Sequence, residues 1–428
     1  MIDIKLIREN PELVKENMKK KFRKDLSIVD KVKKLDEEWR AFKAEEDNLR
    51  AERNKISKEI NEGKKEKKNV DKLILRAKEI PDKIDESTEK RKVMEQEIIK
   101  LRSSIPNIMS KNVIIGEDDS KNVAEKYFGE KRKFNFEIKS HSEIIENLGL
   151  ADFDSSARVS GTGFYYLQGD VALLNQALIR LGIETMVKKG FLYVETPLML
   201  NEEIIDQVTD LNDKQNQIYL IEGEKKALIG TSEHSLIGRY VDQEINEKDL
   251  PIKHTSYSMC FRKEIGAHGI DEKGIFRTHQ FNKIEMIVIC KPEESEKFFQ
   301  ELQNITVEVF EKLKIPGRVL KICSGDLGDL KYEQIDVEAW SPRKQGYIEV
   351  GSCSNLTTAQ AQKLNITTRI KGERITPHTL NNTCIATSRA LVALIENYQN
   401  KDGSITIPEV LRPFMFGKEK IEGLKKKN

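Results

Sequence analysis

The residues best suited to chemistry lie in one stretch, residues 261–285, which reads FRKEIGAHGIDEKGIFRTHQFNKIE. Its charged and aromatic members near the two ends are Arg262, Glu264, Arg277, Phe281 and Glu285. A plain β-hairpin would alternate apolar and polar side chains and keep its turn short. Charged groups beside an aromatic ring suit an anionic ligand that itself carries an aromatic ring. We therefore predict that this stretch binds a nucleotide.

Other polar residues with possible roles at a site stand where strands or helices are expected to end. They are Thr231-Ser232-Glu233 before a helix at 234–241, the run Glu349-Val350-Gly351-Ser352, and Asn381-Asn382-Thr383 before a helix at 386–398 that carries Arg389. The carboxylate of Glu349 among small polar residues is placed to hold a cation. The alternatives are structural: Thr-Ser-Glu is a good helix cap, and Arg389 could lie on the surface.

The elements that must position these residues are mainly strands. We predict strands over residues 254–264, 282–290, 318–323, 334–340 and 346–352, a helix over 171–189 ended by Gly190, and a short helix near 142–148. No regular helices separate the later strands, which favours an α+β fold with a mainly antiparallel sheet flanked by helices. No GxxxxGK[ST] loop and no GxGxxG after a strand occurs, which excludes the usual parallel-sheet nucleotide binders.

The N-terminal quarter has a different pattern, that of a helical hairpin. Apolar residues recur every seven positions over roughly 30–60 and again over 70–105, the period of a coiled-coil seam. Polar residues interrupt the seam at Glu46, Arg53, Ser87 and Arg91, and a basic turn joins the two segments at 61–69. Pro81 is expected to bend the second helix. Residues 1–29 should form one or two short helices, with Pro11 in a first turn.

Charge and cysteine usage limit the function classes. The 428 residues are 34% charged with a net charge of +2, while residues 1–100 hold 29 Lys and Arg against 24 Asp and Glu. This mildly basic arm suits contact with a polyanion, and the alternative is a dimerisation or scaffold arm. The five cysteines show no metal-ligand or disulfide spacing, and no run approaches the length of a membrane span. We expect a soluble cytosolic protein with no membrane contact.

Taken together, these motifs resemble those of class II aminoacyl-tRNA synthetases. Motif 1 corresponds to residues 186–197, motif 2 to 260–285 and motif 3 to 386–396. Within that class the chain is similar to the seryl-tRNA synthetase family over nearly all its length. The matching segments include the hairpin, Thr231-Ser232-Glu233, FRKE at 261–264, His279-Gln280-Phe281, SCSN at 352–355 and IPEVLRP at 407–413. The resemblance implies a tRNA-binding arm at 1–105 and a class II catalytic domain at 106–428.

The resemblance also implies a role for each site residue. ATP would be bound by Arg262, Lys263, Glu264, Thr278, Phe281, Glu349, Val350, Gly351, Ser352 and Arg389, with Arg262 and Arg389 catalytic. L-Serine would be bound by Thr231, Ser232, Glu233, Glu285 and Thr383, although Thr383-Cys384 stands where many relatives have Ser-Gly. Glu349 and Ser352 would hold Mg²⁺. The implied reaction forms seryl-adenylate and then charges tRNA(Ser), and whether tRNA(Sec) is also charged stays open.

The same resemblance implies a homodimer through motif 1. Two alternatives are left open: another class II specificity such as threonine, and a synthetase-like protein that has lost tRNA charging. His268 and Asp271 are the residues we expect near the acceptor end of the tRNA.

Overall fold

The chain forms two compact units, Met1–Pro106 and Asn107–Asn428. The computed structural model describes residues 2–265 and 274–424. No helix in these two ranges is long and apolar enough to cross a membrane.

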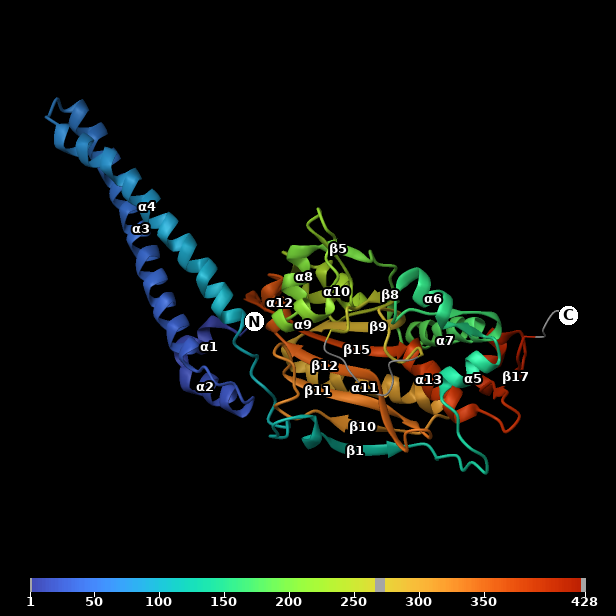
Figure 1. Ribbon diagram of the computed structural model, residues 1–428. Helices are drawn as coiled ribbons and strands as arrows, with labels where there is room; N and C mark the ends of the chain where they lie inside the picture. Colours follow the sequence, from blue (N-terminus) through green and yellow to red (C-terminus); the bar gives the residue numbers. More distant parts are fainter. Residues whose placement is uncertain (1, 266–273, 425–428) are drawn as a thin grey trace. The chain divides into compact units, whose positions relative to one another are not determined.

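The first unit is helical. Its helices are α1 (Ile4–Glu9), α2 (Pro11–Lys20), α3 (Ser27–Lys65) and α4 (Asp71–Ser103). The two long helices lie side by side as a hairpin (Figure 1). Their seam is apolar, with Leu49 and Ile56 of α3 packed against Ile80 and Ile84 of α4. The predicted helical hairpin is therefore confirmed, and α4 is continuous through Pro81.

Three of the polar interruptions of the seam, Glu46, Ser87 and Arg91, make hydrogen bonds across the hairpin. Arg91 Nε donates to Glu46 Oε1 at 2.9 Å, and the Glu46 side chain is fully buried. Ser87 Oγ donates to the carbonyl of Phe42 at 3.4 Å. These residues therefore replace apolar contacts by specific polar ones, which fix the register of two helices better than an apolar seam alone.

The second unit is built on an eight-stranded sheet with the order β1-β10-β11-β12-β15-β9-β8-β4 (Figure 1). In that order the strands are Val123–Phe128, Gly317–Lys321, Glu333–Ser341, Gly346–Thr357, His378–Ala386, Gln280–Cys290, Ile252–Phe261 and Leu192–Tyr193. Neighbouring strands are antiparallel except β8 and β4, which are parallel. The predicted fold class, a mainly antiparallel sheet flanked by helices, is confirmed.

Helices cover both faces of this sheet. They are α5 (His141–Asn147), α6 (Phe153–Ser160), α7 (Gly169–Lys188), α8 (Glu202–Val208), α9 (Leu211–Gln217), α10 (Ser232–Gly238), α11 (Ser295–Lys312), α12 (Ala359–Lys363) and α13 (Thr387–Tyr398). Strand β9 shows how the faces divide. Ile284, Met286 and Val288 join the core with α7, α11 and α13, whereas Ile287 and Ile289 pack against α8, α10 and α12. Because side chains alternate along a strand, Glu285 lies on the α10 side.

Several parts of this unit differ from the sequence-based expectation, among them strand β1 in a region expected to be irregular and helix α10, expected at 234–241. Strand β15 and helix α11 were not predicted, and β8 ends at Phe261 rather than continuing to residue 264. Beyond Phe261 the backbone leaves the ladder: Lys263 N donates to the carbonyl of Gln217. Glu264 then has a φ of 50°, in the left-handed region, which a strand does not allow.

Candidate active site

A buried carboxylate, Glu285 of β9, lies at the centre of the site. Its side chain is 2% exposed, and its Oε2 accepts a hydrogen bond from Thr383 Oγ1 at 3.2 Å. Lys283 Nζ lies 2.7 Å from the same oxygen. The strand register brings these groups together, because Thr383 of β15 pairs directly with Glu285. The three residues form what we call the central cluster.

A second carboxylate, Glu233, reaches the same region from the first turn of α10. Its Oε1 accepts hydrogen bonds from Gln360 Nε2 and Asn381 Nδ2, both at 2.9 Å. Burial and the negative charge of Glu285 raise the pKa of Glu233 to about 7. Thr231 caps the helix, since its hydroxyl accepts from the amide of Glu233 at 3.3 Å. The helix-cap and binding-site interpretations of this segment are thus compatible.

Ser232, between Thr231 and Glu233, contacts the neighbouring strand β8. Its side chain is fully buried, and its hydroxyl donates to the carbonyl of Ser256 at 3.4 Å. This contact holds α10 to β8, and the serine-binding role implied for Ser232 stays a prediction.

The motif 2 arginine lies beside its aromatic partner. Arg262 donates from Nε to the carbonyl of Gly230 at 3.1 Å, and its guanidinium carbon is 5.3 Å from the ring centroid of Phe281. Its backbone position is fixed by His279, whose backbone carbonyl accepts from the amide of Arg262 and whose Nδ1 lies 2.9 Å from the Arg262 carbonyl. The site therefore presents a cation directly next to an aromatic face.

The remaining predicted residues of motif 2 lie around this pair. Glu264 forms an ion pair with Arg277, with 3.6 Å between Oε2 and Nη1. Thr278 is 3% exposed and donates its hydroxyl to the carbonyl of Gln280, which leaves backbone contacts as its route to a ligand. His268 and Asp271 lie outside the described residues.

Strand β12 supplies the third group of charges. Glu349 Oε2 lies 3.0 Å from Arg389 Nη1 of α13, and 43% of the Glu349 side chain is exposed. The positive charge of Arg389 lowers the pKa of Glu349, so this carboxylate is ionised at neutral pH. Val350 is 1% exposed and points into the core. At Gly351 an added Cβ would lie 2.9 Å from Thr306, so these two positions can contribute only backbone atoms to a ligand.

Next to Glu349 lies a buried acid that the sequence did not single out. Asp336 of β11 pairs with Ser352 in the strand register, and Gln334 Nε2 donates to both Asp336 Oδ1 (2.7 Å) and Ser352 Oγ (3.0 Å). Burial and the charge of Glu349 raise the pKa of Asp336 to about 7. We call Gln334, Asp336, Glu349, Ser352 and Arg389 the β12 cluster.

The β12 cluster has the donors that Mg²⁺ requires. This ion prefers oxygen ligands and is usually held by one or two carboxylates together with substrate phosphates. Glu349 and Ser352 provide a carboxylate and a hydroxyl oxygen. The negative charge of Glu349 raises the pKa of Asp336, and a bound cation would reduce this repulsion between the two carboxylates. Among the described residues there is no group of three or more His, Cys, Asp or Glu side chains that could hold a metal ion by itself. The donor set therefore fits an ion shared with a phosphate.

Sequence reasoning missed Lys283, Asp336 and Gln360, whereas Asn381 was singled out with its neighbours Asn382 and Thr383. Lys283 carried a usable signal, because it stands two residues before Glu285 and therefore lies on the same face of its strand. Asp336 and Gln360 had none, because only the sheet order and the packing of α12 bring them close.

The sheet, its flanking helices and the charged motif 2 and motif 3 residues define the class II aminoacyl-tRNA synthetases. Residues 217–398 match the family model for the tRNA synthetase class II core domain (G, H, P, S and T). Residues 1–109 match the model for the seryl-tRNA synthetase N-terminal domain.

Full-length relatives narrow the class to one family. The chain is 44% identical to a serine–tRNA ligase of Methanocella arvoryzae, over 98% of this chain and 100% of that protein. Seryl-tRNA synthetase from Pyrococcus horikoshii, solved in complex with ATP, superposes with a TM-score of 0.93 at 39% identity, covering 99% and 100% of the two chains. The cytoplasmic serine–tRNA ligase of Naegleria fowleri, solved with AMP, gives 0.88 at 32% identity, covering 100% and 99%. The chain belongs to the seryl-tRNA synthetase family.

Proposed function

We propose that the chain carries out the reaction of its family, the ATP-dependent ligation of serine to tRNA, at the site formed by the central cluster and the β12 cluster. The observation that carries the proposal is the arrangement of charge around one face of the sheet. Buried carboxylates and a threonine hydroxyl can bind a small polar amino acid. Arg262, Phe281 and Arg389 can bind a nucleoside triphosphate.

The central cluster is suited to serine. Glu285 and Thr383 can hydrogen-bond the serine hydroxyl, and Glu233 can accept its ammonium group once ionised. Thr231 lies at the same helix start. A site that hydrogen-bonds a substrate hydroxyl rejects the analogue without it by a large factor, because its buried polar groups are then left unpaired. Such a site can discriminate against alanine in a single step.

The second substrate is ATP. Phe281 offers a face for the adenine ring, Glu264 an acceptor for its amino group, and Arg262 a charge for the α-phosphate. Further contacts with ATP are assigned to Lys263, Thr278, Val350 and Gly351. Glu349 and Ser352 would hold Mg²⁺, which supplies positive charge between the phosphates. Arg389 is assigned to the far side of the nucleotide from Phe281, where it would bind the γ-phosphate.

The chemistry requires positioning and charge neutralisation more than proton transfer. A carboxylate oxygen of serine attacks the α-phosphorus, the bond to the bridging oxygen breaks, and pyrophosphate leaves with that electron pair. Arg262 and Arg389 neutralise the negative charge that develops, in a site where water is partly excluded. The terminal ribose hydroxyl of the tRNA then attacks the acyl carbon of seryl-adenylate and releases AMP.

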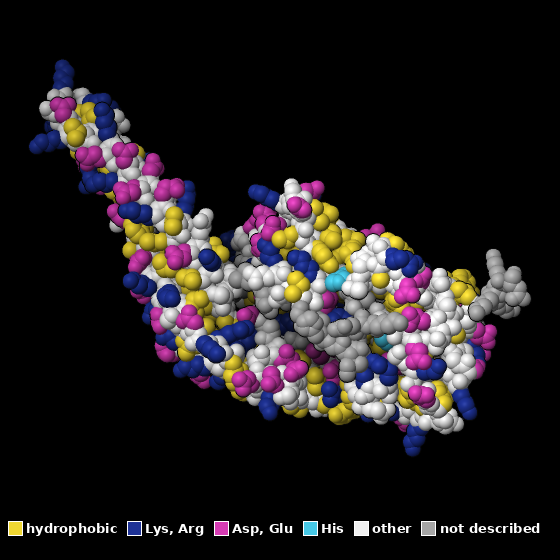
Figure 2. Space-filling view, in the orientation of Figure 1, with side chains coloured by type: hydrophobic (Ala, Val, Ile, Leu, Met, Phe, Trp, Pro, Cys, Tyr) yellow, Lys and Arg dark blue, Asp and Glu magenta, His cyan; other side chains and the backbone are white. Residues whose placement is uncertain are grey.

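The tRNA contact is assigned to the α3–α4 hairpin. Residues 64–69, at the end of α3 and in the turn that follows, are all exposed and include Lys64, Lys65, Lys67 and Lys68. Figure 2 shows Lys and Arg interspersed with Asp and Glu on the visible face of the two helices. Mixed charge with a basic tip suits recognition of an RNA helix by its shape and backbone. Deleting residues 30–103 should therefore leave adenylate formation and abolish charging of tRNA(Ser), and the same comparison can be made with tRNA(Sec).

We assign a homodimer and a cytoplasmic location to the protein. Apolar side chains remain exposed on and around motif 1, among them Val187, Leu192, Leu198 and Met199, with Met259 on the adjoining strand β8. Strand β4, which carries Leu192, is the edge of the sheet. All five cysteines, which lie in the described ranges, are buried and unpaired, as in a reducing compartment.

The test of the function is ATP–pyrophosphate exchange with the purified full-length chain. We expect exchange with serine, little with threonine or alanine, and loss of exchange in Arg262→Ala. Exchange driven better by threonine would overturn the specificity. Serine-dependent exchange without transfer to tRNA(Ser) would identify an enzyme that has lost charging.

A further inference from the structure

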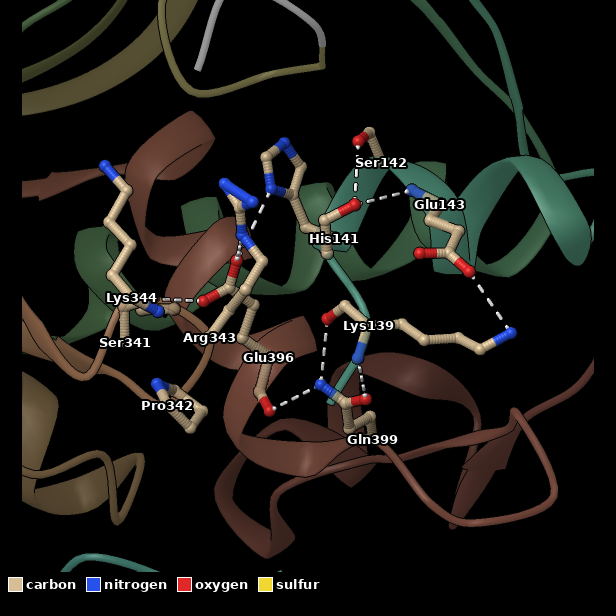
Figure 3. A network of polar contacts seen from close by, with 12 residues as sticks. Lys139, His141, Ser142, Glu143, Ser341, Pro342, Arg343, Lys344, Glu396 and Gln399 are labelled. Atoms are coloured by element: carbon tan, nitrogen blue, oxygen red, sulfur yellow. Dashed lines mark hydrogen bonds and ion pairs between the residues drawn. The ribbon is translucent and has the colours of Figure 1, made fainter. Parts of the chain in front are cut away.

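A buried histidine outside the predicted site connects two of its parts. His141 begins α5 and is 2% exposed. Its Nε2 accepts a hydrogen bond from the backbone N–H of Ile275 at 3.3 Å. Its Nδ1 lies 3.7 Å from Oε1 of Glu396, a carboxylate that is also 2% exposed (Figure 3). The imidazole therefore lies between the entry to strand β9 and helix α13.

The hydrogen bond from the Ile275 amide determines which tautomer of the neutral ring is present. Since Nε2 accepts, the neutral imidazole carries its proton on Nδ1, directed to the Glu396 side. That carboxylate is held from its other side as well. Ser341 Oγ donates to Glu396 Oε2, and Arg343 Nε lies 3.6 Å from Oε1. Figure 3 shows His141 on one segment of the chain and Ser341 and Arg343 on another, both directed at Glu396 of α13.

Both ends of this connection lead to Arg389, which is assigned to ATP. Ile275 directly precedes Phe276, whose ring centroid lies 5.5 Å from the guanidinium carbon of Arg389. Glu396 lies on the same helix as Arg389, seven residues or two turns later. A displacement at residue 275 would therefore move Phe276 relative to Arg389.

The backbone next to Ile275 is adapted to the ring. Gly274 has a φ of 113°, a conformation that other residues rarely adopt, and a Cβ there would lie 2.3 Å from His141 Nε2. Only glycine allows the imidazole to approach this closely. The contact thus combines a glycine, a backbone donor and a buried acid.

We propose that His141 is a positioning residue for ATP: its imidazole fixes the entry of β9 to α13 and so holds Phe276 against Arg389. The inference rests on the proposed function, because it assigns an effect on ATP. It predicts an effect on nucleotide binding that is separate from the effect on serine, whose assigned residues Glu285 and Thr383 have no direct contact with this connection among the described residues.

Two substitutions of His141 separate positioning from simple core packing. His141→Gln places an amide oxygen near the position of Nε2, where it can accept from Ile275. His141→Asn is too short to do so. We expect His141→Asn to raise the KM for ATP in pyrophosphate exchange about three- to tenfold, the effect of one lost hydrogen bond, with the KM for serine unchanged. His141→Gln should stay within about twofold of the wild type.

Thermal unfolding of both variants provides the structural control. If the histidine only fills the core, the two substitutions lower the unfolding temperature but leave the KM for ATP and the KM for serine as in the wild type. That result overturns the proposal. An equal rise in the KM for serine overturns it too. If neither variant folds, Gly274→Ala tests the same contact, because its added Cβ would displace the imidazole of His141. An unchanged KM for ATP in that variant overturns the proposal. A wild-type protein without serine-dependent exchange would instead contradict the proposed function itself.

Discussion

Arg389 of α13 and Glu349 of β12 form an ion pair, with 3.0 Å between Nη1 and Oε2. Each is assigned to a charge of opposite sign on the same substrate, Arg389 to a phosphate and Glu349 to the Mg²⁺ beside it. Their mutual effect is visible in the pKa of Glu349, which Arg389 lowers, and in the pKa of Arg389, which Glu349 raises. Each partner holds the other in place, and the binding of Mg²⁺ and ATP would exchange this contact for two new ones.

Removal of the arginine should therefore affect the transition state strongly. Arg389→Gln is expected to lower kcat/KM for ATP in pyrophosphate exchange by about 10²–10³, the range for one preorganised charged donor. The control is Arg318→Gln, which removes an arginine paired with Glu338 on the same sheet but outside the site. Equal activity of the two variants would contradict the role of Arg389.

A second substitution tests the serine hydroxyl contact. Thr383→Val keeps the shape of the side chain and removes the hydroxyl that donates to Glu285. The KM for serine should rise about tenfold, with the KM for ATP unchanged and alanine less strongly rejected. The matched control is Thr379→Val on the same strand, a buried threonine whose hydroxyl has no hydrogen-bond partner within the described structure. A KM for serine that responds equally to both changes would place the hydroxyl contact elsewhere.

Serine binding should also depend on pH through Glu233. Its pKa is raised to about 7 by burial and by Glu285, so the carboxyl is protonated below that pH and ionised above it. Only the ionised form attracts the serine ammonium. The KM for serine should consequently rise about tenfold between pH 8 and pH 6, as expected for one group titrating near 7. In Glu233→Gln, the KM should be higher and nearly independent of pH over this range. A wild-type KM that is flat from pH 8 to 6 would remove Glu233 from the ammonium site.

The sequence predicted the parts of the site that carry unusual side chains and missed those defined by packing. Arg262, Phe281 and Glu285 could be recognised because charged and aromatic residues interrupt an otherwise apolar strand pattern. Strand β15 could not, since Asn381, Asn382 and Thr383 have the composition of a turn, and only their neighbours on both sides make them strand residues.

The arm shows the same division. The seven-residue repeat predicted two paired helices, while the interruptions looked like defects of the seam. Glu46 and Arg91 are in fact partners, but no single-helix pattern relates residues 45 positions apart. Such pairing follows from the register of the hairpin, which depends on the turn at residues 66–70 that joins α3 to α4.

The Glu46–Arg91 pair provides a last prediction, which links arm stability to tRNA charging. Glu46→Ala removes the hydrogen-bond acceptor of Arg91 Nε at the seam and leaves the more distant Glu95 carboxylate, 3.7 Å from Nη1. Loss of such a hydrogen bond costs about 1–3 kcal/mol. Amide exchange in the middle of α3 and α4 should accelerate accordingly. Because a loosened hairpin presents a poorer surface to RNA, kcat/KM for tRNA(Ser) should fall about tenfold while ATP–pyrophosphate exchange stays unchanged.

The control, Glu52→Ala, breaks the more exposed pair with Arg76 and should affect neither amide exchange nor tRNA charging. Replacing Glu46 and Arg91 together by leucine should restore protection to the helices. If tRNA charging stays low in that double variant, the charges themselves contact the RNA, whereas recovery shows that the arm needs only its rigidity.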